Sequence, residues 1–109
     1  MRVFGITLGA ILIAVAALPA QARNLGKNEL EMCRWGASVA GTAQQHKLSG
    51  TTLYSARSNL KKSKYTKPWM LKMALGITEQ TYRSKSKLHP SAVKKTYYDG
   101  CVKHEMARR

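Results

Sequence analysis

The sequence predicts an all-α protein, a small bundle of about four helices whose first and last members are joined by a disulfide. Apolar residues recur at intervals of three and four in four segments, which is the spacing of one helix face. No segment shows a convincing alternation of apolar and polar residues, the pattern of a half-buried strand. The two cysteines of the mature chain, Cys33 and Cys101, fall on the apolar faces of the first and last segments.

The chain begins with the three parts of a secretory signal. Arg2 supplies a positive charge, residues 3–18 are mostly apolar, and Ala20-Gln21-Ala22 offers two small residues to a signal peptidase. The apolar stretch is shorter than the roughly 20 residues that span a membrane. We therefore predict a cleavable signal peptide over residues 1–22 and a mature helical domain over residues 23–109, periplasmic or secreted, with no membrane span.

The first helix is predicted over about residues 29–47. Asn28 can cap its first turn, and Glu31, three residues on, completes the pattern of a capping box. The helix carries a series of small residues at positions 36, 37, 40, 41 and 43. Because the distance between packed helices depends on the side chains at the contact, we expect another helix to approach this face closely.

The second helix is predicted to start near Thr51 or Thr52, after a break at Ser49-Gly50. Three apolar residues mark its buried side: Leu53, Ala56, Leu60. The pattern fades into the lysine-rich residues 61–67, which we expect to form an exposed connection.

The third helix is predicted to begin at Pro68, because a first-turn residue needs no N–H. It ends at a polar, basic break over residues 83–87. The fourth helix opens at Pro90, and its inner stripe carries three residues spaced four apart: Val93, Tyr97, Cys101. We expect the last residues, 106–109, to be frayed.

In an exported protein, two cysteines on core-facing stripes are expected to pair, and only one intramolecular pairing exists. A chain this short buries a limited core, so such a staple matters, and the chain-entropy model values it at about 4 kcal/mol. The alternatives are a redox pair, which lacks a Cys-x-x-Cys motif, and a zinc site of Cys33, Cys101 and His104, which lacks the usual paired spacing. We therefore predict a Cys33–Cys101 disulfide, with no metal and no cofactor.

The charge balance is strongly positive. The chain has 19 Lys and Arg against 5 Asp and Glu, a net charge of +14, and removal of the leader subtracts only the charge of Arg2. No acidic residue occurs between Met32 and Thr78. Such an imbalance favours anionic partners. Two clusters occupy the breaks on either side of the third helix, and we expect both to bind anions: the first basic cluster of Lys61, Lys62, Lys64 and Lys67, and the second basic cluster of Arg83, Lys85 and Lys87.

The two clusters are expected at opposite ends of the third helix, because breaks that flank one helix leave from its two ends. Exposed charges more than about 10 Å apart are largely screened near physiological salt, so each cluster would then act alone. Three aromatic residues lie among the basic ones: Tyr54, Tyr65, Trp69. They could stack on nucleic-acid bases, although burial in the core or at its rim is the more usual fate of aromatic residues in a small domain.

Catalytic patterns are not evident. His46, His89 and His104 are the candidate bases, and each is explained by a helix end or a break. No Ser/His/Asp order, paired carboxylates or glycine-rich phosphate loop stands out. We therefore expect no catalytic residues and a protein that acts by binding.

The residues Cys33 and Tyr82, the His89-Pro90-Ser91-Ala92-Val93 helix start and Tyr97-Tyr98-Asp99-Gly100-Cys101 form a recurring outline. It resembles that of small exported one-disulfide helical proteins of Gram-negative bacteria, most of them uncharacterised, so the resemblance implies a fold rather than an activity. Two functional groups share the outline. They are periplasmic acid-stress chaperones, whose cysteines are spaced differently, and periplasmic immunity proteins that block amidase toxins, whose inhibitory loop does not align here.

Two binding functions are carried forward, beside an enzyme of unknown reaction and a basic surface that keeps the protein soluble without a specific ligand. The first is a non-enzymatic basic binding protein that associates with anionic envelope components. The second is a periplasmic protein–protein role, as an immunity protein, inhibitor or small chaperone, in which the partner would be an acidic protein. Nucleic acid is a possible anion that no motif supports.

Overall fold

The computed structural model describes residues 25–108, and within them the chain forms four helices and no strand. The helices are α2 (Lys27–Leu48), α3 (Leu53–Lys62), α4 (Pro68–Arg83) and α5 (Pro90–Ala107). The all-α prediction is confirmed. The signal peptide predicted over residues 1–22, with its cleavage site, lies outside the described residues.

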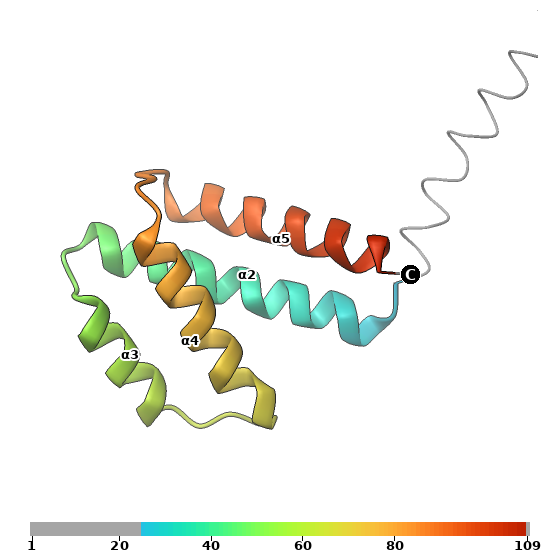
Figure 1. Ribbon diagram of the computed structural model, residues 1–109, viewed down its shortest axis with the longest axis horizontal. Coiled ribbons are helices and arrows are strands. Elements are labelled where there is room, and N and C mark those ends of the chain that lie inside the picture. The colour runs from blue at the N-terminus through green and yellow to red at the C-terminus, as the bar shows by residue number, and fades with distance from the viewer. Residues whose placement is uncertain (1–24, 109) are drawn as a thin grey trace, which may run out of the picture.

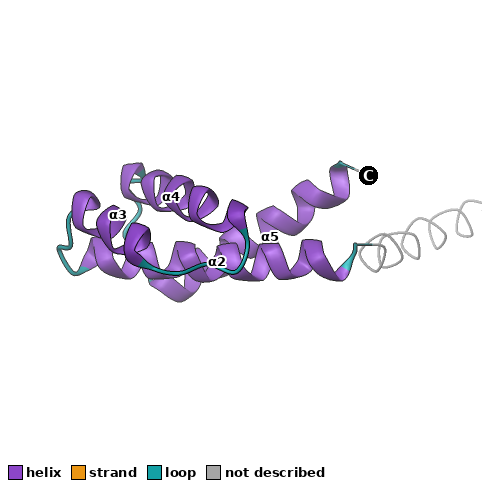
Figure 2. Cartoon of the chain, turned by 90° about the horizontal axis from the view of Figure 1, so that it is seen from below, coloured by secondary structure: helices purple, strands orange, loops and turns teal. Residues whose placement is uncertain are grey.

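The long helices α2 and α5 run side by side in opposite directions, and α4 crosses α2 on another side (Figure 1). The contact between α2 and α5 is the most extensive in the molecule, and that between α2 and α4 is second. α3 lies against α4 and touches α2 at only a few places, so α3 and α4 form a layer over α2 (Figure 2). α2 is therefore the central element of the bundle.

The contact between α2 and α5 depends on small residues, as predicted. Cys33, Ala37 and Ala40 are buried along α2. A Cβ atom on Gly36 would lie 2.7 Å from the ring of Tyr97, and one on Gly41 would lie 3.3 Å from the carbonyl oxygen of Pro90. Gly36 therefore leaves room for the ring of Tyr97, and Gly41 leaves room for the first turn of α5.

The predicted disulfide is confirmed. The sulfurs of Cys33 and Cys101 are bonded, with 5.5 Å between the Cα atoms. The bond joins the N-terminal half of α2 to the C-terminal half of α5, which lie side by side (Figure 1). Because each sulfur is bonded to the other, neither is available as a thiolate ligand for zinc. A structural disulfide also indicates a location outside the cytoplasm.

Four predicted helix boundaries are wrong, one of them the end of α4, which includes Arg83 instead of leaving it to the break. α2 begins at Lys27 with Gly26 as its N-cap, so Asn28 lies inside the helix and does not cap it. α3 continues through Lys62, so Lys61 and Lys62 form its last turn rather than part of the connection. α5 continues to Ala107, because the disulfide and the buried side chain of Glu105 hold its last turns in place.

The other helix starts follow local chemistry. The hydroxyl of Thr52 accepts a hydrogen bond from the backbone N–H of Ser55 at 3.1 Å and caps α3. α4 and α5 begin at Pro68 and Pro90, as predicted. His89 caps α5, since its Nδ1 accepts a hydrogen bond from the backbone N–H of Ser91 at 3.1 Å.

Two polar side chains of α2 hold the connection between α4 and α5. Gln44 is only 1% exposed, and its Nε2 donates hydrogen bonds to the carbonyls of Ser86 and Leu88 at 3.2 and 2.7 Å. One turn on, the Nζ of Lys47 donates hydrogen bonds to three carbonyls, those of Thr81 at 3.1 Å, Ser84 at 2.8 Å and Ser86 at 3.0 Å. We call this pair the loop clamp. Its acceptors are one carbonyl in the last turn of α4, the carbonyl of the C-cap residue Ser84, and two carbonyls in the connection.

Candidate anion-binding surface and neighbouring cavities

The two basic clusters lie at the two ends of α4. α4 has 16 residues, so at the helical rise it separates its own ends by about 24 Å. This distance exceeds the screening length of about 10 Å near physiological salt, so the clusters are two separate surfaces rather than one.

The first basic cluster is exposed and unneutralised. Lys61 and Lys62 lie in the last turn of α3, Lys64 lies in the connection, and Lys67 is the N-cap residue of α4. All four side chains are exposed. None of them makes a hydrogen bond or an ion pair with any other residue in the range 25–108. Their positive charge is therefore available to a partner.

The second basic cluster is partly neutralised. Arg83 forms an ion pair with Glu79 at 2.8 Å, and Glu79 also contacts Arg57 at 3.5 Å. Lys85 and Lys87 are exposed, and their side chains are unpaired among the described residues. This cluster offers two free cations on a connection whose backbone is held by the loop clamp, so the first cluster is the stronger candidate for binding anions.

Aromatic residues pack beside the first basic cluster. The ring of Trp35 in α2 meets the rings of Trp69 and Tyr65 edge to face, with centroid distances of 5.7 and 6.4 Å. The hydroxyl of Tyr65 donates a hydrogen bond to the carbonyl of Leu60 at 2.6 Å. Trp69 nonetheless remains 38% exposed. The expectation of core or rim positions holds for Tyr65 and Trp69 and is wrong for Tyr54, which is 83% exposed.

A groove of about 390 Å³, here called the aromatic groove, lies between α2 and the start of α4. Its apolar lining includes Trp35, Trp69 and two methionines. Its lining also includes polar and charged residues: Asn28, Glu31, Arg34, Ser38, Thr66, Lys67. Lys67 belongs both to this groove and to the first basic cluster, so the two features are continuous.

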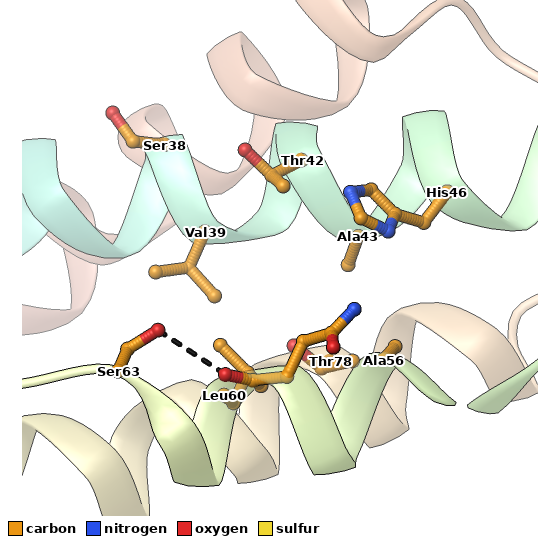
Figure 3. A pocket seen from close by; sticks show the side chains of 10 residues that line it. Ser38, Val39, Thr42, Ala43, His46, Ala56, Leu60, Ser63 and Thr78 are labelled. Carbon is orange, nitrogen blue, oxygen red and sulfur yellow. Dashed lines mark hydrogen bonds between the residues drawn. The ribbon is translucent and has the colours of Figure 1, made fainter. Parts of the chain in front are cut away.

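A second cavity, of about 290 Å³, lies between α2 and α3 where these helices barely touch. Figure 3 shows Val39 and Ala43 of α2 facing Leu60 and Ala56 of α3 across it, with His46 at one end. The lining is mostly apolar and contains no charged residue of the described chain. No carboxylate lines this cavity to pair with His46, so the arrangement does not make an acid–base pair there.

The three histidines lie at separate positions along α2 and α5. His46 lies near the end of α2, His89 caps α5, and His104 lies in the last turns of α5. Residues 25–108 contain no group of three or more His, Cys, Asp or Glu side chains placed to hold a metal ion.

None of the helices between residues 25 and 108 is long and apolar enough to cross a membrane. No protein-family model, curated protein or solved structure matches this chain.

Proposed function

We propose that this protein is an exported, non-enzymatic binding protein, periplasmic or secreted, that associates with anionic components of the cell envelope through the first basic cluster. One observation carries the proposal: four exposed lysines at one corner have no acidic partner among the described residues. Near an anionic membrane surface each lysine contributes about 1 kcal/mol of attraction. Four lysines in this short segment therefore suffice for reversible association.

The proposed location rests on two independent features. The leader has the charge, apolar stretch and small residues of a secretory signal. The disulfide belongs to an oxidising compartment.

The experiment is a binding assay of the oxidised protein with vesicles containing phosphatidylglycerol, over a series of salt concentrations. Binding should weaken steeply with salt, because exposed charges are screened. The double variant Lys61→Gln/Lys62→Gln should weaken binding. Its matched control, Lys85→Gln/Lys87→Gln, removes the same charge from the second cluster and should have little effect. Absence of vesicle binding at low salt, or equal loss in both variants, would refute the proposal.

A protein partner is the second candidate function, in an immunity, inhibitor or chaperone role. The observation that favours it is a pair of exposed leucines at the other end of the molecule, Leu48 at 48% and Leu88 at 53% exposure. Leu88 belongs to the connection held by the loop clamp, and Lys85 and Lys87 lie in the same connection. This surface suits an acidic protein with an apolar centre. A stoichiometric complex that resists salt and is lost in Leu88→Ser would support this function instead.

A further inference from the structure

The aromatic groove narrows the choice among envelope anions. Building on the proposed function, we infer that this groove binds a phosphorylated sugar, with the sugar ring against Trp69 and Trp35 and the phosphate at Lys67 and Arg34. The groove thereby gives the protein selectivity that the lysines of the first basic cluster alone would not provide.

Two tryptophans form the apolar part of the groove that would contact the sugar ring. Trp35 and Trp69 lie edge to face at 5.7 Å, and Trp69 is partly open to solvent within the groove. A sugar ring has an apolar face of C–H groups and a polar rim of hydroxyls. Such a ligand matches a groove whose aromatic rings are surrounded by hydrogen-bonding groups, the usual composition of small-molecule sites.

Polar side chains that have no partner among the described residues form another part of the groove lining. Asn28, Glu31 and Arg34 lie on the part of α2 that lines the groove, and their side chains bond to no other residue between 25 and 108. An amide both donates and accepts hydrogen bonds, and a carboxylate accepts them, so Asn28 and Glu31 suit sugar hydroxyls. Arg34 presents a planar fork of donors that matches a phosphate.

The charge of the lining favours a ligand with one anionic group over a polyanion. Arg34 and Lys67 contribute two positive charges, and Glu31 contributes one negative charge within the same groove. A nucleic-acid strand, charged along its whole length, would bring phosphates towards Glu31. A ligand with a phosphate at one end and uncharged hydroxyls at the other avoids this repulsion. The groove volume of about 390 Å³ also falls within the range of about 300 to 1,000 Å³ for small-ligand sites.

The test uses the intrinsic fluorescence of the oxidised protein, because its two tryptophans both line the groove. Glucose 6-phosphate is the probe, and glucose and inorganic phosphate are the comparison ligands. Glucose 6-phosphate should change the emission in a saturable way, at lower concentration than either comparison ligand. Arg34→Gln and Lys67→Gln should each weaken binding about tenfold, the loss of one hydrogen bond to a charged group. Trp69→Ala, followed through Trp35, should also weaken it.

The control variant is Lys85→Gln/Lys87→Gln, which should bind glucose 6-phosphate like the parent, and circular dichroism should show the same helix content in every variant. The inference is overturned if glucose 6-phosphate produces no saturable change, or if inorganic phosphate binds equally well. It is also overturned if a single-stranded oligonucleotide binds more tightly through the same residues. If phosphatidylglycerol vesicles still bind while glucose 6-phosphate does not, the inference alone fails. If neither binds, the proposed function fails with it.

Discussion

α5 and α3 both flank α2, but they are held in different ways. α5 lies along α2 over an extensive contact lined by glycine and alanine, and the Cys33–Cys101 bond fastens its C-terminal half. α3 rests mainly on α4, touches α2 at only a few places, and is separated from it by a cavity of about 290 Å³. α2 is therefore packed far more extensively against α5 than against α3.

The proposed binding surface lies on the side of α3, the helix that packs less extensively against α2. Regions with few buried apolar contacts open locally at a lower free energy than the core. The first basic cluster occupies the end of α3 and the connection that follows it. Its lysines can adapt to a partner without disturbing the close packing between α2 and α5.

The largest loss of stability is expected from removing the Cys33–Cys101 disulfide. Replacing both cysteines in Cys33→Ser/Cys101→Ser should lower the free energy of unfolding by about 2–5 kcal/mol, the usual loss for a small secreted domain. Denaturant titration measures this change. Hydrogen exchange should show that the amides of α5 lose most of their protection, whereas those of α3 already exchange fastest in the parent. Protection of α3 equal to that of α5 in the parent would contradict the comparison.

The second-largest loss of stability is expected from removing the Gln44 side chain of the loop clamp. Gln44→Ala should lower the free energy of unfolding by about 1–3 kcal/mol, because it removes the hydrogen bonds of a buried amide to the part-buried carbonyls of Ser86 and Leu88. Gln45→Ala is the matched control, since the side chain of Gln45 is exposed and unpaired in the described part of the chain. It should change stability by less than about 0.5 kcal/mol. Thermal unfolding of the two variants checks this prediction, and equal losses would show that the clamp contributes nothing.

A pair of glycine substitutions sharpens the contrast between close and open packing. Gly36→Ala places a methyl group 2.7 Å from the Tyr97 ring and should destabilise the protein by about 1–3 kcal/mol. Gly76→Ala, within α4, meets no atom within 4 Å and should stabilise it by about 0.5–1 kcal/mol through helix propensity. Chemical denaturation should therefore shift the two midpoints in opposite directions, and a shift in the same direction would refute the packing argument.

The smallest change in stability is expected at alkaline pH, where Tyr97 loses its proton. Burial raises the pKa of Tyr97, which lies against Gly36, above its ordinary value. The folded state thus holds this proton more strongly than the unfolded chain does. The stability linked to this bound proton is fully present below about pH 10, the ordinary pKa of tyrosine. It is lost as the pH rises from there towards the pKa of Tyr97 in the folded state. Tyr97→Phe should lessen the fall in unfolding midpoint over this range, and an unchanged pH dependence would contradict the prediction.

The helix starts were predictable because their chemistry is local. Pro68 and Pro90 mark first turns whatever lies around them, and the cysteines fell on apolar stripes that identify facing helices. The start of α2 was placed too late because Asn28 fits a capping pattern in sequence, while Gly26, two residues earlier, adopts the extended backbone of the actual N-cap. Several residues of one short segment can satisfy the same capping rule, and packing selects among them.

The loop clamp and the aromatic groove were not predictable in the same way. Gln44 and Lys47 bond to carbonyls about forty residues away, and a polar residue near a helix end looks the same in sequence whether it is clamped or solvated. The contact of Trp35 with Trp69 likewise depends on how α4 crosses α2. The pairing of Arg83 with Glu79 is different, since their spacing of four on one helix was a visible signal that the second cluster is partly neutralised.

The disulfide has a topological consequence. Cys33 and Cys101 are separated by 68 positions, so α3, α4 and the lysine-rich connection between them all belong to a covalent ring closed through sulfur. Exposed connections are the preferred sites of proteolytic nicking, and proteases that cut after lysine have several targets in residues 61–67. A single cut there opens the ring without dividing the molecule, and its two pieces separate only on reduction. Outside the cytoplasm, where little reductant is present, such a nicked protein persists as a two-chain molecule.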